Sequence, residues 1–139
     1  MKVVVCQIVI QIVTITIVVS CLALSVSSES PFSDFFSKFK AAVMAGNTNR
    51  LQDLMAQDFD YMGTANATPS TVFKDLSSGQ WINLQLAVQA QAFTSQTYKD
   101  KPARLLKCTP ATAYSKCYVV FQTDSSGNWR WKAMIMPEK

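Results

Sequence analysis

The residues best suited to chemistry in this chain are Asp58 and Asp60, which flank Phe59 and precede Tyr61. A carboxyl group desolvated in an apolar pocket has a raised pKa and can act as a general base. Alternation along a strand over residues 57–62, however, would put Phe59 and Tyr61 on one side and both aspartates on the other. We therefore expect two solvated aspartates on the outward side of an edge strand, with Asp60 as the one acid–base candidate.

The chain contains no histidine, which removes the side chain most used for proton transfer near pH 7 and the commonest metal ligand. Cys6 and Cys21 lie in an apolar N-terminal stretch, and Cys108 and Cys117 flank a turn-rich segment. A catalytic thiol would lack a basic partner, and a metal site with two cysteines would lack further ligands. We expect a disulfide between Cys108 and Cys117, no metal and no cofactor.

Residues 1–27 have the organisation of a secretory signal peptide. Lys2 supplies the basic start, and an apolar stretch runs from Val3 to Val19. The stretch is longer than usual, so an uncleaved N-terminal signal anchor is the alternative. Polar residues within it, and the absence of a basic cluster after it, favour cleavage. The prediction is an extracellular domain over residues 28–139 with no stable membrane insertion after cleavage.

Two surface features depend on that location. Asn66-Ala67-Thr68 is a glycosylation sequon that a secreted protein can use, although sequons also arise by chance. Basic residues gather near the predicted third and fourth strands, namely Lys99, Lys101, Arg104, Lys107 and Lys116. They could hold anionic glycans, phospholipid heads or nucleic acid, but lysines also protect a sheet edge from pairing. We favour the protective role and expect no nucleic-acid partner.

Apolar residues before and after the aspartates recur at helical spacing. Ser30-Pro31 provides a capping hydroxyl and a proline for a first helix, whose apolar stripe is Phe32, Phe35, Phe36, Phe39 and Val43. Gly46 ends this helix, and Asn47 or Thr48 caps a second with Leu51, Leu54 and Met55 inward. Thr68-Pro69 opens a third, which Gly79 ends.

The rest of the chain alternates as strands do. We expect strands over residues 57–62, 81–93, 103–108, 114–123 and 129–136, with a polar connection at 94–101 and a turn at 125–128. The resulting fold class is α+β: three N-terminal helices packed on one face of a strongly curved antiparallel sheet.

Two motifs near the N-terminus resemble the opening of nuclear transport factor 2-like domains, also known as SnoaL-like or ketosteroid-isomerase-like cone folds. They are Phe39-x-x-Ala42-x-x-Ala45-Gly46-Asn47 and Leu51-x-x-Leu54-Met55-Ala56-x-Asp58-Phe59-x-Tyr61. Trp129-x-Trp131-Lys132 also resembles the last strand of such domains. The resemblance implies a cone-shaped α+β barrel whose sheet curls around a pocket capped by helices, and it is strongest with secreted members of unknown function.

The same pocket serves isomerases, dehydratases, epoxide hydrolases, cyclases and binding modules, so the fold does not fix the function. The tyrosine that donates to the oxyanion in the steroid-isomerase-like members falls on Phe39, and their general-base aspartate falls on Gly63. Dehydratase-like members need a histidine. Asp60 and Arg104 could converge as in epoxide hydrolases, but no spacing requires it. No residue is assigned as catalytic.

An aromatic and aliphatic set could line the pocket for a small apolar ligand: Phe36, Phe39, Val43, Tyr61, Phe73 and Leu76. Such a stripe is more often simply core. We expect a secreted, non-enzymatic domain that binds a small apolar ligand or a protein partner. The alternatives are an enzyme (isomerase, cyclase or hydrolase-like) with an atypical site near Asp60, and a purely structural interaction protein. Trp129 and Trp131 beside the glutamine-rich face of 81–93 suggest a homodimer through the sheet.

Overall fold

The computed structural model describes residues 30–76, 80–108 and 117–135. The chain divides into two compact units, Met1–Ser33 and Asp34–Lys139, and the fold described below is that of the second. The predicted signal peptide lies outside the described residues. Within the described ranges, no helix is long and apolar enough to cross a membrane.

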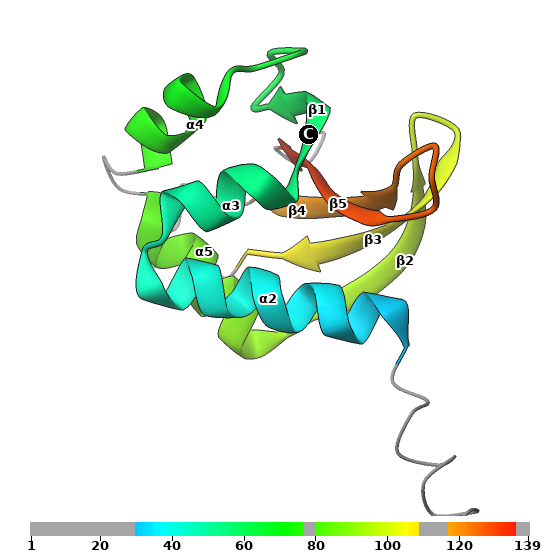
Figure 1. The fold of residues 1–139 in the computed structure, drawn as a ribbon, viewed down its shortest axis with the longest axis horizontal. Coiled ribbons are helices and arrows are strands. Elements are labelled where there is room, and N and C mark those ends of the chain that lie inside the picture. Colours follow the sequence, from blue (N-terminus) through cyan, green and yellow to red (C-terminus); the bar gives the residue numbers. More distant parts are fainter. Residues whose placement is uncertain (1–29, 77–79, 109–116, 136–139) are drawn as a thin grey trace, which may run out of the picture. The chain divides into compact units, whose positions relative to one another are not determined.

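The described residues form the helices α2 (Pro31–Ala45), α3 (Thr48–Leu54), α4 (Pro69–Asp75) and α5 (Trp81–Ala90) (Figure 1). Their ends follow the local rules that the sequence suggests. Gly46 has a φ of 65° directly after α2, a left-handed conformation that favours glycine. The side chains of Asn47 and Thr68 each accept the backbone N–H three residues on, at 3.1 and 3.4 Å. The first three predicted helices are therefore confirmed, except that Gly79, the predicted end of the third, lies outside the described residues.

One sheet contains the strands β1 (Met55–Tyr61), β2 (Phe93–Tyr98), β3 (Lys101–Lys107), β4 (Tyr118–Thr123) and β5 (Trp129–Ile135), in the order β1-β5-β4-β3-β2. The α+β class is as predicted, but the sheet is mixed, because β1 pairs with β5 in parallel. A fully antiparallel sheet was the wrong expectation. Parallel pairing needs a long crossover, which here includes α4, α5 and the strands that follow.

The segment 81–93 is a second correction, because residues 81–90 form helix α5 and not a strand. Its buried side chains are Asn83, Leu84, Ala87 and Val88, a spacing that one face of a helix produces. Ile82 is 58% exposed, although a strand would have placed it beside Leu84. Leucine, glutamine and alanine are good helix formers, so local preference is compatible with the helix that burial of this face selects.

The polar connection expected over residues 94–101 is also wrong, since most of it is β2. Residues 94–97 are exposed, so the strand shows no buried alternation in the sequence. Lys99 and Asp100 have φ values of 49° and 62°, the left-handed conformations of a two-residue hairpin turn. This turn joins β2 to β3.

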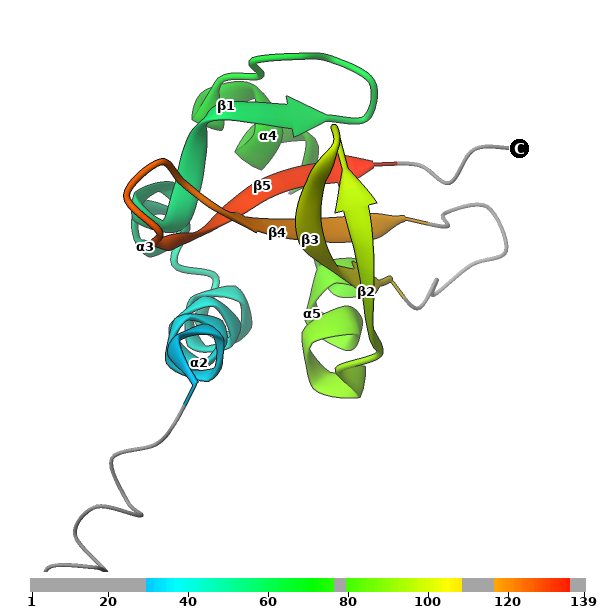
Figure 2. The same ribbon diagram turned by 90° about the vertical axis from the view of Figure 1, so that its right-hand side faces the viewer.

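Aromatic rings fill the space between α2 and the sheet, and Figure 2 shows α2 and α5 on the same side of it. The ring of Phe39 lies 5.0 Å from that of Phe121 and 5.3 Å from that of Trp131. Phe59 of β1 packs edge-on against Trp131 at 4.8 Å. Edge-to-face pairs at these separations add to the free energy of burial. The core therefore sits beneath the first helix, as the aromatic stripe predicts.

The sheet is strongly curved, as a contact between its two edge strands shows. Tyr98 at the end of β2 hydrogen-bonds Asp60 of β1 through its hydroxyl, at 2.8 Å. In a flat sheet these strands would be four spacings apart, about 19 Å, which a tyrosine side chain cannot span. The β2–β3 hairpin accordingly runs at a steep angle to β4 and β5 (Figure 2).

The predicted disulfide between Cys108 and Cys117 is present, with the two Cα atoms 5.1 Å apart. Cys108 directly follows β3 and Cys117 directly precedes β4, and the N–H of Cys108 donates to the carbonyl of Cys117 at 2.9 Å. The disulfide therefore continues the β3–β4 ladder by one further pair. Disulfides persist in oxidising compartments, which is compatible with an extracellular protein.

Candidate functional site

The residues predicted to line an apolar pocket are core residues. Phe39, Val43 and Leu76 have no solvent exposure, and Phe36 and Tyr61 are also buried. Phe73 is half-buried, with its ring 6.5 Å from that of Trp131. The rings of Phe36 and Phe39 pack against Phe121 of β4, and Phe39 also packs against Trp131 of β5. That a small apolar ligand binds among these residues stays a prediction.

The two positions that match catalytic residues of steroid isomerases have structural roles here. Phe39 is buried against Phe121 and Trp131 and carries no hydroxyl. Gly63 follows β1 in a turn with a φ of 88°, a conformation that side chains rarely adopt. Neither position provides an oxyanion donor or a base.

A polar cavity of about 810 Å³ lies elsewhere in the unit, and we call it the charged groove. Its lining consists of residues 55–58 of β1, residues 122–125 at the end of β4, and Asp53, Lys101, Arg130 and Lys132. The volume is within the range of pockets that hold ligands. None of the six predicted pocket residues contributes to it.

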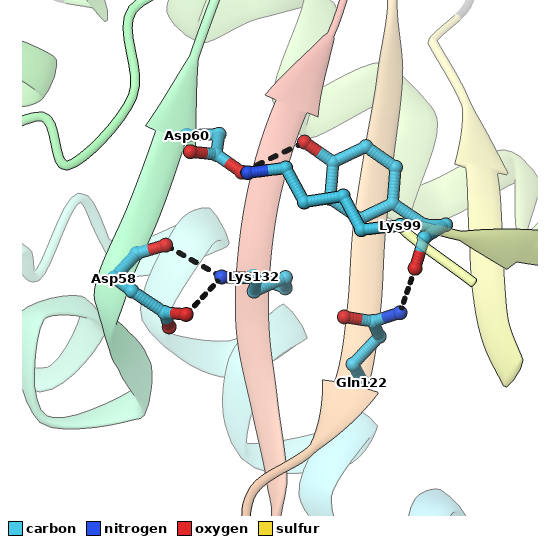
Figure 3. Close-up of polar contacts among 6 residues, drawn as sticks. Asp58, Asp60, Lys99, Gln122 and Lys132 are labelled. Atoms are coloured by element: carbon cyan, nitrogen blue, oxygen red, sulfur yellow. Dashed lines mark hydrogen bonds and ion pairs between the residues drawn. The ribbon is translucent and has the colours of Figure 1, made fainter. Parts of the chain in front are cut away.

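Asp58 and Lys132 form the first ion pair of the charged groove (Figure 3). The Lys132 ammonium lies 2.6 Å from the Asp58 carboxylate and donates to the Asp58 carbonyl, also at 2.6 Å. The Lys132 side chain is only 10% exposed, whereas that of Asp58 is 72% exposed. A buried ammonium needs such partners. The hydrogen bond from Lys132 lowers the pKa of the Asp58 carboxyl and outweighs the effect of its partial burial.

Asp60 is buried, which corrects the expectation that it is solvated. Its Oδ2 atom lies 2.6 Å from the Lys99 ammonium and 2.8 Å from the Tyr98 hydroxyl (Figure 3). The alternation itself holds, because Phe59 packs against Trp131 on the side of α2 while Asp60 lies on the opposite face. Asp60 is buried because Tyr98 and Lys99 of the hairpin cover that face. Asp60 therefore lies on the sheet face over which the β2–β3 hairpin folds.

The environment of Asp60 makes it an ionised acceptor rather than a base. Burial raises the pKa of this carboxyl, but the hydrogen bonds from Lys99 and Tyr98 and the charges of Lys99 and Lys132 together lower it. Burial, and then the bond to Asp60, raise the pKa of Tyr98 to about 12. A carboxylate with a lowered pKa accepts protons weakly near pH 7.

Gln122 and Arg130 fix the backbone around the charged groove. The Gln122 amide donates to the carbonyls of Tyr98 and Lys101, at 2.7 and 3.2 Å (the first is drawn in Figure 3). The Arg130 guanidinium pairs with Asp124 at 3.0 Å and donates to the Asp53 carbonyl at 3.1 Å. Each side chain therefore ties two segments of the groove wall together.

Sequence reasoning found part of this site and missed the rest. Lys99 and Lys101 belonged to the predicted basic cluster, and Asp60 was singled out. Gln122, Arg130 and Lys132 were not identified as site residues, although a lysine directly after a core tryptophan is an unusual strand neighbour. Arg104 lies over the Trp129 ring at 5.9 Å, and its convergence with Asp60 stays a prediction. Lys116 lies outside the described residues.

Two further predictions concern the surface. Asn66 is exposed in the turn after β1, and the Thr68 hydroxyl of its sequon caps α4. Occupancy by a glycan stays a prediction. Among the described residues, no cluster of histidine, cysteine or acidic side chains could hold a metal ion.

No protein-family model matches the chain, and neither does any curated protein. Among solved structures, one from Shewanella frigidimarina NCIMB 400 described as a "putative ketosteroid isomerase" aligns with 78% of this chain and 96% of its own. The identity is 11% and the TM-score is 0.41. A match this distant shows no residue role.

Proposed function

We propose that this chain is a secreted, non-enzymatic binding domain that holds a protein partner in the charged groove. The observation that carries the proposal is a groove of about 810 Å³ lined by six charged side chains, of which Asp53 and Lys101 form no ion pair within the described residues. Charges that are not used within the domain can pair with opposite charges on another molecule and fix its position. The six charged side chains of the lining suit a segment of a protein better than an apolar small molecule.

The chemistry of the carboxylates supports the non-enzymatic part. A general base needs a pKa near the working pH, whereas the pKa values of Asp58 and Asp60 are lowered by their lysine partners. Phe39 and Gly63 stand where the steroid-isomerase-like members have their catalytic groups. The alternative of an enzyme with an atypical site near Asp60 would require that Lys99 leave this carboxylate during turnover.

Secretion is supported by the disulfide between Cys108 and Cys117 together with the composition of residues 1–27. Mass spectrometry of protein recovered from the medium of expressing cells measures the cleavage site and the glycan at Asn66. A chain that keeps residues 1–27 and stays with the membrane fraction would favour the signal anchor.

A photo-crosslinking side chain at Gln57, an exposed residue of the groove wall, tests the binding function. In medium conditioned by the cells that secrete the domain, we expect a protein adduct that excess unmodified domain competes away. The matched control is the same side chain at Lys38, exposed on α2 and outside the groove. An equal adduct at both positions, or none at Gln57, would contradict the proposal. So would turnover of a screened substrate that Asp60→Ala abolishes.

A small ligand in the core is the second candidate, and one observation favours it. The indole Nε1 of Trp131 is the buried side-chain polar atom without a hydrogen-bond partner among the described residues. Buried donors normally find an acceptor, and a ligand carbonyl or hydroxyl near Phe39 and Phe59 would supply one. Native mass spectrometry of the secreted protein tests this, because a bound compound adds mass that Trp131→Phe reduces.

The homodimer through the sheet also stays a proposal. Trp131 cannot contribute, because it is fully buried beneath α2, and the glutamine-rich segment is a helix. A dimer would instead use the other face of the sheet, where Tyr118 and Ile135 are half-buried beside Val120. Sedimentation velocity measures the oligomeric state, and a monomer at high concentration would rule the dimer out.

A further inference from the structure

We infer that the partner segment in the charged groove is an extended peptide with one basic and one acidic side chain, bound by Asp53 and Lys101 respectively. The inference rests on the proposed function and names the chemistry of its ligand. It follows from the charges of the groove, the supports of those charges, the backbone of β1 and the size of the cavity.

The groove carries equal numbers of opposite charges: Asp53, Asp58 and Asp124 against Lys101, Arg130 and Lys132. Four of these six are used within the domain, as the pairs Asp58–Lys132 and Arg130–Asp124. Within the described residues, the side chains of Asp53 and Lys101 form no ion pair. A ligand with one charge would be attracted by one of these two residues and repelled by the other. A ligand with both charges can pair with each of them.

Both of these charged residues are held by a polar side chain of the groove itself. Arg130 donates to the carbonyl of Asp53, and Gln122 donates to the carbonyl of Lys101. Gln122 is buried, so its position is fixed by packing. Fixing the backbone of a recognition residue before binding lowers the entropic cost of association. The side chains of Asp53 and Lys101 are exposed, but these hydrogen bonds hold the backbone of each residue in place. Two charges that only face solvent would not need such hydrogen bonds.

The backbone of β1 favours an extended ligand. Met55 pairs with Trp131 and Asp60 pairs with Ala133, so residues 56–59 of β1 stand against the single residue Lys132 of β5. The ladder is interrupted over this stretch, and residues 56–58 line the groove. The carbonyls of Asp58 and Phe59 are used within the domain, by Lys132 and by the N–H of Ala67. An added extended segment would therefore use the backbone of Ala56 and Gln57.

The size of the cavity points the same way. About 810 Å³ is near the upper end of ordinary ligand pockets, which is more than one free amino acid fills. Lining residues come from β1, β3, β4 and β5, so the groove crosses several strands. A short extended segment uses this length, and its two charged side chains reach Asp53 and Lys101.

Fluorescence anisotropy with labelled, capped hexapeptides tests the inference in the full secreted domain. Four peptides are compared, in which two positions separated by three small polar residues are Lys and Glu, Glu and Lys, both Lys, or both Glu. We expect one mixed peptide to bind tightest. Asp53→Asn and Lys101→Met should each weaken it about fivefold, as the loss of one exposed charge pair predicts. The double exchange Asp53→Lys with Lys101→Asp should transfer the preference to the peptide of opposite order.

Controls use matched residues outside the groove. Asp34→Asn on α2 and Lys107→Met at the far end of β3 change the same charges and should leave the affinity unchanged. Circular dichroism checks that each variant folds.

Equal affinity for all four peptides, or wild-type affinity in both Asp53→Asn and Lys101→Met, would overturn the inference. Free lysine or glutamate that binds as tightly as the mixed peptide would replace it with a small-zwitterion site. A competed adduct at Gln57 without any peptide preference would remove this inference and leave the proposed function standing. A preferred mixed peptide without an adduct would support the peptide site and contradict the wider role.

Discussion

At the scale of single residues, one carboxylate oxygen joins the two edges of the sheet. Oδ2 of Asp60 on β1 accepts from Tyr98 and pairs with Lys99, both at the tip of the β2–β3 hairpin. Gln122 holds the same tip through the carbonyls of Tyr98 and Lys101. The charged groove therefore depends on these contacts, because Lys101 is in place only while the hairpin tip is folded over the sheet.

Removing the Asp60 carboxylate should destabilise the domain. Hydrogen bonds to charged groups contribute about 1.5–3 kcal/mol, and the exposure of Lys99 reduces the share of the ion pair. We expect Asp60→Asn to lower the free energy of unfolding by about 1 kcal/mol, and Asp60→Ala by about 2 kcal/mol because it also leaves Tyr98 without an acceptor. Urea unfolding measures both. Asp100→Asn in the same hairpin turn is the control, and an unchanged midpoint in Asp60→Ala would contradict the role given to Asp60.

The pH dependence of stability follows from the same carboxylates. The pKa values of Asp58 and Asp60 are lowered from 3.8 in the folded domain, so the unfolded chain binds protons more readily as the pH falls. Their contribution is therefore complete above about pH 4 and is lost as the pH falls through the folded-state values. Unfolding measured from pH 6 to pH 2 should show a steeper loss in the wild type than in Asp58→Asn/Asp60→Asn. Parallel curves would show that other groups control acid unfolding.

At the scale of elements, α5 and the β2–β3 hairpin decide what the sheet can expose. α5 lies on the same side of the sheet as α2 (Figure 2). This helix therefore does not cover the opposite face of the sheet, which carries the charged groove. A strand in its place would have lengthened the sheet and supplied the glutamine-rich surface of the predicted dimer. The position of the site therefore depends on how one ambiguous segment folds.

Substitutions in α5 distinguish the helix from a strand. Leu84 has no exposure and Ile82 is 58% exposed, whereas a strand would put both on one face. We expect Leu84→Ala to lower the free energy of unfolding by about 3 kcal/mol. Ile82→Lys should change it by less than about 0.5 kcal/mol. Urea unfolding measures both, and similar losses in the two variants would be inconsistent with the helix.

At the scale of the whole domain, the sheet holds its curvature through contacts at both ends of the β3–β4 region. The disulfide between Cys108 and Cys117 closes one end of this hairpin, and Gln122 ties β4 to the β2–β3 turn. Between them, Leu105 and Val120 are buried on the sheet face away from α2. The domain thus has a large aromatic core under α2 and a small aliphatic cluster on the opposite face.

Loss of the disulfide should destabilise this arrangement without abolishing the fold. For a sequence separation of 9, the chain-entropy model gives about 2.5 kcal/mol. We expect Cys108→Ala/Cys117→Ala to lower the free energy of unfolding by that amount in thermal and urea unfolding. A reductant should cause a similar loss in the wild type and no further loss in the double variant. A reductant effect that persists in the variant would exclude this disulfide as its cause.

Local rules were enough for the N-terminal half of the domain. Pro31, Gly46, Asn47 and Thr68 mark helix ends through their own backbone preferences and short-range hydrogen bonds, and the sequence predicts each of them. The cysteine count predicts the disulfide, and the aromatic stripe predicts the core beneath the first helix. The α+β class follows from these elements and from the strands near the C-terminus.

Only the tertiary structure decided the segment 81–93, the direction of β1 and the environment of Asp60. The first is ambiguous because alternating and helical spacings coincide over a few turns, and packing against the sheet selects the helix. The second depends on a crossover of more than sixty residues between β1 and β5. Asp60 meets Tyr98, 38 residues away, because the sheet curls, and no local pattern encodes that curl. The sequence by itself suggested that Asp58 and Asp60 are solvated or that Asp60 is a base. In the tertiary structure both are ion-paired acceptors beside a groove that several distant strands build.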